Sequence, residues 1–204
     1  SNGNSSSATL TNNIGPDDYL VGVDKGAITL LINHYYLDLA IGDFDSVSQT
    51  EFKLIKQKAK ELITFKKEKD YTDTELALKA VIKKGYCDIA ILGGIGTRLD
   101  HTLANVLLLE KYQKRNIQIK IIDNHNEISL VTDKQTINKN KLYNYITFLS
   151  LTDLSLISLT GFKYPLKNKK VERGETLCVS NELVGEKGTI EVKNGKVLLI
   201  KSKD

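Results

Sequence analysis

The sequence predicts an α/β protein in which a Rossmann-like parallel-sheet domain is followed by a small antiparallel β-sandwich. In the first part of the chain, short apolar runs alternate with amphipathic helical segments, and this alternation is typical of parallel strands joined by helical crossovers. After about residue 125 the sequence pattern changes. Short expected strands follow one another with turn residues between them and without a convincing helix. We therefore expect residues 1–125 and 126–204 of this 204-residue chain to form two domains.

Apolar periodicity and helix-capping residues define the elements expected in the first domain. Residues 1–18 are rich in Ser, Asn and Gly, so we expect a loop there. Two helices are expected to open with capping boxes, in which Glu51 follows Ser48 and Glu75 follows Thr72 at the required spacing. In chain order, we expect strands at residues 19–23, 39–41, 62–65, 88–92 and 117–122, and helices at about residues 27–35, 48–60, 72–84 and 101–114.

Turn residues separate the strands expected in the second domain. These strands are expected at residues 127–131, 145–149, 155–159, 176–180, 189–192 and 197–201. Between the last two, Asn194-Gly195 is a strong signal for a two-residue hairpin. Residues 163–173 are the most basic stretch, but they lack the interleaved stacking aromatics of a nucleic-acid site, so we expect a solvated loop.

The composition excludes several classes of protein. With 41% hydrophobic residues, 26% charged residues and a formal net charge of +4, the chain resembles an ordinary globular protein. No apolar run is long enough to span a bilayer and no signal peptide is visible, so we expect a cytoplasmic protein without membrane or nucleic-acid partners. Cys87 and Cys178 are expected to be reduced, buried thiols. Because the chain contains no Met and opens on turn residues, we expect a further strand upstream.

Several carboxylates directly follow the expected strands. Asp43 and Asp45 stand in the loop after residues 39–41, and two carboxylates at this spacing suit Mg²⁺, which prefers oxygen ligands. The alternative is that Asp45 and Ser46 only start the next helix. The residues that follow strands in this domain are Asp24, Asp43, Asp45, Asp70, Asp73, the loop 93–100 and Asp123. Because parallel sheets bind ligands beyond the carboxyl ends of their strands, this clustering favours a metal site.

A glycine-rich loop precedes the last helix of the first domain. In Gly93-Gly94-x-Gly96-Thr97, backbone N–H groups at the helix start could hold phosphate oxygens, and Arg98 adds a forked cation that suits phosphate. The loop is neither a Walker A motif nor a Rossmann fingerprint, and its alternative interpretation is a tight turn. Together with the carboxylates, it indicates phosphoryl transfer. In the second domain, Ser180-Asn181 could bind a small polar ligand or simply form a turn.

These motifs together resemble the bacterial type of thiamine pyrophosphokinase (thiamine diphosphokinase). The matching blocks follow the family's order and cover nearly the whole chain: residues 23–27 (VDKGA), 41–46 (IGDFDS), 70–78 (DYTDTELAL), 93–105 (GGIGTRLDHTLAN), 161–166 (GFKYPL) and 180–182 (SNE). Two positions depart from the family's pattern. Lys25 stands where many members have Gly, and Glu182 and Leu183 follow Ser180-Asn181 where some members stack an aromatic on thiamine.

The resemblance implies an activity and an organisation. The activity is transfer of the β,γ-diphosphate of ATP to the hydroxyl of thiamine, with Mg²⁺, to give thiamine diphosphate and AMP. The organisation is an ATP-binding α/β domain, a thiamine-binding sandwich, and a homodimer whose active sites lie between the first domain of one subunit and the second domain of the other. Carried over by position, the resemblance implies four sets of residues: Asp43, Asp45 and Asp73 for the metal; Asp73, Asp100 and Asp24 for catalysis; Gly94, Gly96, Thr97, Arg98 and Thr72 for ATP; and Ser180, Asn181 and Asp100 for thiamine.

Two other functions stay open at this point. An aspartyl-phosphate phosphatase would use the Asp43-x-Asp45 pair, but the downstream lysine and acidic pair that it needs cannot be placed. A non-catalytic nucleotide or thiamine sensor could keep the same fold. The intact carboxylates Asp43, Asp45, Asp73 and Asp100 argue against a sensor, because a pure binder has no need of negative charge near phosphates.

Overall fold

The computed structural model describes residues 6–66, 68, 70–114 and 116–204. Its contacts divide the chain into two compact units, Ser1–Gln118 and Ile119–Asp204, and each unit is described here by itself. The domain boundary expected at residue 125 therefore falls inside the second unit. The opening turn expected at residues 1–4 lies outside the described residues. Among the described residues, no helix is both long and apolar enough to cross a membrane.

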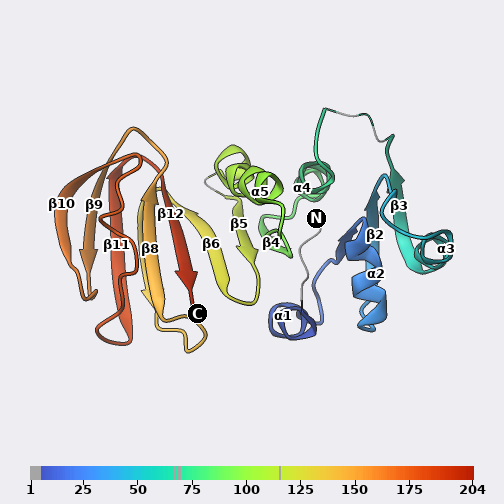
Figure 1. The fold of residues 1–204 in the computed structure, drawn as a ribbon, viewed down its shortest axis with the longest axis horizontal. Coiled ribbons are helices and arrows are strands. Elements are labelled where there is room, and N and C mark those ends of the chain that lie inside the picture. The colour runs from blue at the N-terminus through green and yellow to red at the C-terminus, as the bar shows by residue number, and fades with distance from the viewer. Residues whose placement is uncertain (1–5, 67, 69, 115) are drawn as a thin grey trace. The chain divides into compact units, whose positions relative to one another are not determined.

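A parallel sheet of three strands forms the centre of the first unit (Figure 1). Its order is β1 (Val21–Val23), β2 (Leu37–Gly42) and β3 (Ala59–Thr64), and both pairs are parallel. The central strand is almost wholly apolar because both of its faces are covered. Leu37 and Ala40 belong to one core cluster, with residues of α2 (Lys25–Ile32) and α3 (Gln49–Lys58). Leu39 and Ile41 belong to a second cluster, with Ala77 of α4 (Asp73–Lys83).

The segment expected to be an N-terminal loop contains a helix, α1 (Ser7–Asn13), so that prediction is wrong. Ser6 is its N-cap, and the Ser6 side chain accepts a hydrogen bond from the backbone N–H of Thr9. Leu10 is buried with residues of α2 and β2. The Ser- and Asn-rich composition indicated a turn, but here a serine caps a short helix that one buried leucine attaches to the core.

The two expected capping boxes have different outcomes. Ser48 and Glu51 form both halves of the box at the start of α3. At the start of α4, Thr72 accepts a hydrogen bond from the backbone N–H of Glu75, but the Glu75 side chain turns away to Lys111 and Tyr112. Both partners lie in α5 (Leu99–Tyr112), so Glu75 joins two helices instead of completing a cap.

The parallel sheet is smaller than expected, because the strand β5 (Gln118–Ile122) does not belong to it and β4 (Asp88–Leu92) is not among its three strands. β5 pairs antiparallel with β6 (Asn126–Val131). The reason is a tight turn in which one carboxylate oxygen of Asp123 accepts hydrogen bonds from the backbone N–H groups of His125 (2.8 Å) and Asn126 (2.6 Å). Asp123 therefore reverses the chain, and the expectation that it joins the other carboxylates at one sheet edge is wrong.

Two antiparallel arrangements of strands build the second unit, which confirms the antiparallel part of the prediction. In one, β5 and β6 are followed by β12 (Val197–Ser202) and β8 (Tyr145–Ser150); the other has the order β10 (Leu166–Glu172), β9 (Leu154–Thr160), β11 (Lys187–Asn194) and β7 (Lys134–Asn138). Inward-facing residues of both meet in one core, among them Phe148, Ile157, Ile190 and Leu199, all fully buried.

Three local predictions for this unit are wrong. Residues 176–180 form turns instead of a strand, although Cys178 is buried and its carbonyl accepts a hydrogen bond from the N–H of Phe148. Of the two thiols expected to be buried, Cys178 is buried and Cys87, in the first unit, is exposed. The basic stretch expected as a loop contains β10, an exposed strand in which only Val171 is buried. The Asn194-Gly195 turn does not form a hairpin, because β11 and β12 belong to different sheets. Gly195, with a φ of 100°, carries the chain from one sheet to the other.

Candidate functional site

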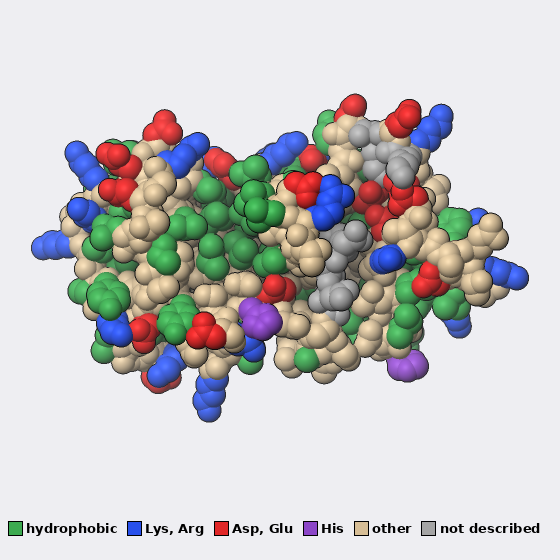
Figure 2. Space-filling model, in the orientation of Figure 1, with side chains coloured by type: hydrophobic (Ala, Val, Ile, Leu, Met, Phe, Trp, Pro, Cys, Tyr) green, Lys and Arg blue, Asp and Glu red, His purple; other side chains and the backbone are tan. Residues whose placement is uncertain are grey.

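Three carboxylates of the first unit come together, and each offers one oxygen atom that lies within 4.8 Å of the other two. Asp24 follows β1, Asp43 follows β2, and Asp73 is the first residue of α4. All three side chains are half-buried. In Figure 2, acidic side chains gather on the visible face of this unit. The meeting of Asp24 and Asp43 follows from the parallel pairing of β1 and β2, which sets Val23 opposite Ile41 and brings the two strand ends level.

Asp24 is fixed by the loop that carries Asp43. Its backbone N–H donates to the carbonyl of Ile41 (3.1 Å), and its Oδ1 accepts from the backbone N–H of Phe44 (3.1 Å). Asp24 has a φ of 48°, a conformation that is uncommon for a residue with a side chain. Strain of this kind persists only where the surroundings impose it, and it is concentrated at functional sites.

Gly42 makes room for the Asp24 carboxylate. A Cβ atom at Gly42 would overlap Oδ1 of Asp24 and lie 2.8 Å from its Cγ, and the Gly42 φ of 153° also disfavours a side chain. The Gly42-Asp43 sequence therefore has a physical basis, because the residue before Asp43 has to lack a side chain for Asp24 to reach the same place.

The three carboxylates repel one another. Burial raises the pKa of Asp24, the negative charges of Asp73 and Asp43 raise it further, and the hydrogen bond from Phe44 opposes both effects. A divalent cation would relieve this repulsion, since an opposite charge stabilises ionised carboxylates. The donor set consists of carboxylate oxygens, which are the ligands that Mg²⁺ takes in proteins. The residues present therefore fit a hard divalent cation.

Asp45 lies beside this group but is not a member of it. Its side chain is exposed, and its backbone N–H donates to Oδ1 of Asp43 (3.1 Å). The short loop thus orients Asp43 through the backbone of Asp45. Asp100 is also outside the group of three.

The glycine-rich loop is shaped by two polar residues of α5 that the sequence did not single out. The buried side chain of Asn105 donates to the carbonyl of Gly94 (2.8 Å), and the Thr102 hydroxyl accepts from the backbone N–H of Gly96 (3.1 Å). Gly93 has a φ of 69°, which a residue with a side chain rarely adopts. A polar residue on the buried face of a helix is the signal that could have identified Asn105.

Arg98 and Asp100 form a two-pronged ion pair at the start of α5. Nε of Arg98 donates to Oδ1 (3.2 Å) and Nη2 donates to Oδ2 (2.5 Å), although the two side chains are 59% and 63% exposed. The hydrogen bonds from Arg98 hold the pKa of Asp100 below its usual range. The arginine fork proposed for phosphate is therefore paired with a carboxylate, while Gly96 and Thr97 beside it are exposed.

Thr72 and the Ser180-Asn181 pair serve local structure. The Thr72 hydroxyl caps α4. Asn181 is only 2% exposed, and its side-chain amide forms hydrogen bonds with both backbone groups of Tyr164. Oδ1 accepts from the N–H of Tyr164 (3.0 Å), and Nδ2 donates to its carbonyl (2.9 Å). Ser180 is exposed, has a φ of 55°, and donates its backbone N–H to Thr147. The pair forms a strained, firmly bonded turn in which Ser180 faces solvent.

Comparison with known proteins identifies both parts of the chain. A family model described as "Thiamin pyrophosphokinase, catalytic domain" matches residues 11–121, and one described as "Thiamin pyrophosphokinase, vitamin B1 binding domain" matches residues 134–197. The sequence is 41% identical over 186 residues to the thiamine pyrophosphokinase of Bacillus subtilis, a match that covers 90% of this chain and 87% of the relative.

Solved structures agree with these matches. A crystal structure of thiamine pyrophosphokinase from Bacillus subtilis superimposes with a TM-score of 0.89 and 38% identity, covering 96% of this chain and 92% of the other. A thiamin pyrophosphokinase family protein from Enterococcus faecalis gives 0.86 and 33%, covering 94% and 92%. The fold, the order of the motifs and both family models agree, and the chain belongs to the thiamine pyrophosphokinase family.

Proposed function

We propose that this protein is a thiamine pyrophosphokinase, which transfers the diphosphate of ATP to the hydroxyl of thiamine and releases AMP. The observation that carries the proposal is that the catalytic and vitamin-binding family models together match both units. The acidic group of the first unit supports it, because phosphoryl transfer depends on positioning and charge neutralisation. The first unit is then a Rossmann-like nucleotide domain, and the second is a thiamine-binding β-sandwich.

Asp43 and Asp73 hold Mg²⁺ in this proposal, and Asp24 completes their group. Asp45 lies outside the group of three and is kept as a metal ligand from the family resemblance alone. The metal would neutralise charge that develops on the transferred phosphates. Asp24 lies beside the two proposed metal ligands of this group, with a carboxylate oxygen within 4.8 Å of both, and is therefore assigned to orient the thiamine hydroxyl and to accept its proton.

The phosphates of ATP meet the start of α5. Backbone N–H groups of Gly94, Gly96 and Thr97, together with the Arg98 guanidinium, bind the phosphate oxygens. The N–H of Gly96 gives up its hydrogen bond to the Thr102 hydroxyl when it does so. For this to happen, Arg98 exchanges its carboxylate partner for phosphate, and the exchange leaves Asp100 available to the substrate thiamine. Thr72, at the start of α4, is a further ATP-binding residue in this proposal.

Ser180 and Asn181 form part of the thiamine subsite. The Ser180 hydroxyl is the exposed member of the pair, and Asn181 keeps the neighbouring segment at Tyr164 in place. We also propose, from the family resemblance alone, a cytoplasmic homodimer in which each active site combines the first unit of one subunit with the second unit of the other. Neither a membrane nor a nucleic acid is part of the proposal.

Product analysis tests the function. Incubation with ATP and Mg²⁺ should yield AMP and thiamine diphosphate only when thiamine is present. A phosphatase would instead release inorganic phosphate without thiamine and would form a base-labile phosphoenzyme on Asp43. A sensor would bind ATP or thiamine without turnover. Either of these results would overturn the proposal.

A further inference from the structure

The first turn of α4 contains a carboxylate that the proposed reaction does not use. Glu75 lies two residues after Asp73, and its side chain is only 11% exposed. Its Oε1 accepts a hydrogen bond from Nζ of Lys111 (2.7 Å) and another from the hydroxyl of Tyr112 (2.5 Å). A third charged partner, Nζ of Lys79, lies 4.0 Å from the same oxygen atom, on the next turn of the same helix.

This arrangement places different demands on Glu75 from the capping box that the sequence predicts. In a capping box, Glu75 would stay near solvent and bond the backbone N–H of Thr72. A buried carboxylate loses its hydration and is stable only when charged partners and hydrogen bonds replace it. The gain is geometric, because Glu75 joins the first turn of α4 to the last turn of α5 through two directed hydrogen bonds.

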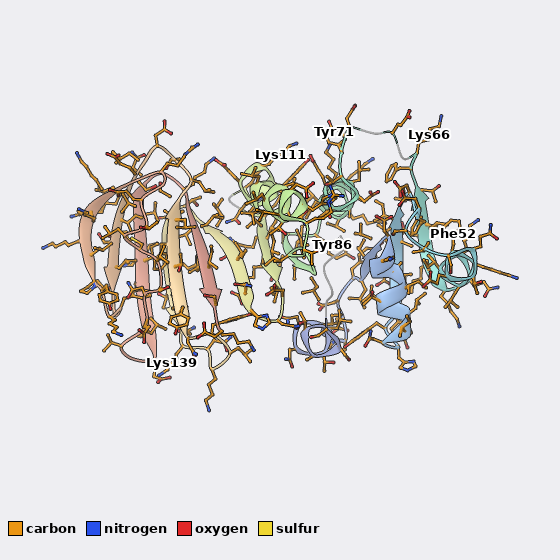
Figure 3. The ribbon with its side chains drawn as sticks, in the orientation of Figure 1. Phe52, Lys66, Tyr71, Tyr86, Lys111 and Lys139 are labelled. Atoms are coloured by element: carbon orange, nitrogen blue, oxygen red, sulfur yellow. The ribbon has the colours of Figure 1, made fainter. Side chains whose placement is uncertain are left out.

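The residue on the other side of Asp73 belongs to the same network. Tyr71 lies two residues before Asp73, and Nζ of Lys79 stands 3.1 Å from the centre of its ring. Nζ of Lys111 lies 5.6 Å from the same ring (Figure 3). Cation–π contacts of this kind fix an aromatic ring against the lysines that cover it. The two lysines that hold Tyr71 also lie within 4.0 Å of the Glu75 carboxylate.

The main chain at Asp73 is thus held from both directions by one set of side chains: Tyr71, Glu75, Lys79, Lys111 and Tyr112, which we call the Glu75 network. We propose that the Glu75 network positions Asp73, so that its carboxylate stays within reach of Asp24 and Asp43. Glu75 is then a positioning residue for cation binding. This inference rests on the proposed function, in which Asp73 is a metal ligand.

Two variants test the network. Glu75→Gln keeps the size of the side chain and removes its charge, and Tyr112→Phe removes only the hydroxyl. Partners that orient metal ligands typically contribute about 10- to 100-fold to metal affinity or activity. We therefore expect each variant to weaken Mn²⁺ binding about tenfold, measured by electron paramagnetic resonance of free Mn²⁺ in the absence of substrates, and to lower kcat without changing KM for thiamine.

The matched control is Glu61→Gln, the same substitution in another ion pair of this unit. Glu61 bonds Lys84 (2.8 Å), which is the C-cap of α4 and therefore lies at the opposite end of the helix from Asp73. This variant should leave Mn²⁺ affinity unchanged. If Glu61→Gln weakened Mn²⁺ binding as much as Glu75→Gln, a general loosening of α4 would explain the result and the inference would fail.

Asp73→Asn separates this inference from the proposed function. If Asp73→Asn leaves Mn²⁺ affinity unchanged, the metal assignment itself is wrong. If Asp73→Asn weakens Mn²⁺ binding while Tyr112→Phe and every folded variant of Glu75 bind as the wild type does, the metal site stands and the positioning role is refuted. A purely structural network would lower the melting temperature and leave Mn²⁺ affinity of the folded protein intact, so both quantities should be measured on each variant.

Discussion

At the scale of single residues, the acidic group depends on a glycine as much as on its carboxylates. Asp24 reaches the group because Gly42 has no side chain. The sequence could predict the participants Asp24, Asp43 and Asp73, because each follows a strand or opens a helix. It could not predict that Asp45 stays outside the group, and the polar residue on the buried face of α5 could identify Asn105 but not its bond to Gly94. Both facts depend on contacts between residues distant in space, which periodicity and spacing do not encode.

Replacing Gly42 with Ala should disrupt the acidic group and the fold together. The added methyl group would overlap the Asp24 carboxylate. Overpacking of this kind costs about 1–3 kcal/mol of unfolding free energy. Urea unfolding should detect this loss, and Mn²⁺ titration should detect weaker cation binding.

Gly26→Ala is the control for the Gly42 variant. A Cβ atom at Gly26 meets nothing within 4 Å, and the residue is helical. Gly26 is the second residue of α2, and alanine has a higher helix propensity than glycine, so this variant should be at least as stable as the wild type. Equal destabilisation by the two substitutions would contradict the role given to Gly42.

Arg98→Lys tests the exchange of partners at the start of α5. A lysine cannot reproduce the two-pronged contact that Arg98 makes with Asp100 or with a phosphate. We expect KM for ATP to rise about tenfold, the equivalent of about 1.4 kcal/mol, while KM for thiamine changes little. Steady-state kinetics in both substrates measures this. Equal increases in the two KM values would mean that Arg98 has been assigned to the wrong ligand.

At the scale of helices and strands, the sequence predicted an element correctly where its residues favour one structure, and it failed where the same residues suit two structures. The buried run of β2 and the complete capping box of α3 were predictable. The helix α1 was missed because its serines and asparagines also suit turns. The strand β10 was missed because exposed lysines dominate it. Asn194-Gly195 has the residues of a hairpin turn, but its strands pair with other partners, which only the assembled core decides.

Asp38 of β2 links two segments of the first unit and should make stability depend on pH. Its Oδ2 accepts from the backbone N–H of Leu20 (2.8 Å), and its Oδ1 accepts from Nζ of Lys60 (2.7 Å). Burial alone would raise the pKa of Asp38, but the bonds from Lys60 and Leu20 outweigh burial and hold it below the ordinary value of 3.8. Hydrogen bonds to charged groups contribute about 1.5–3 kcal/mol, so Asp38→Asn should destabilise the protein at neutral pH by about that amount.

The direction of the pH effect follows from the lowered pKa. The stabilisation by Asp38 is present above the pKa of the unfolded chain and is lost as the pH falls through the lower pKa of the folded protein. The difference in unfolding free energy between wild type and Asp38→Asn should therefore shrink at acid pH. Urea unfolding of both proteins across a pH series measures it, and a difference that grew on acidification would contradict the assignment.

At the scale of the whole molecule, the sequence predicted two kinds of architecture in the right order, and the contacts divide the chain after Gln118, whereas the sequence pattern changes at about residue 125. The difference lies in β5, whose apolar run fits a parallel strand equally well. Its partner is decided by the Asp123 turn, which brings β6 back alongside it. The proposed functions are divided in the same way, since the carboxylates and the glycine-rich loop belong to the first unit and Ser180 belongs to the second.

This division allows the composite dimer to be tested by complementation. One inactive subunit would carry Asp73→Asn in its first unit, and the other would carry Ser180→Trp at the exposed serine of its second unit. In a C2 dimer with shared sites, a mixed dimer has one site with both lesions and one site with neither. Half of the mixed dimers' sites are then intact, so refolding the two proteins together should restore thiamine-dependent AMP formation.

The size of the recovery is set by the arithmetic of mixing. Random association of equal amounts gives about one half mixed dimers, so about one quarter of all sites would be wild type. Two affinity tags allow the mixed dimers to be isolated and assayed alone, where about one half of wild-type activity per dimer is expected. If each site lay within a single chain, every site would keep one lesion and no activity would return. As a control, each inactive subunit is mixed with wild-type subunits, and these dimers should keep about one half of wild-type activity. If they do, and the isolated dimers of the two inactive subunits show no activity, the composite site is ruled out.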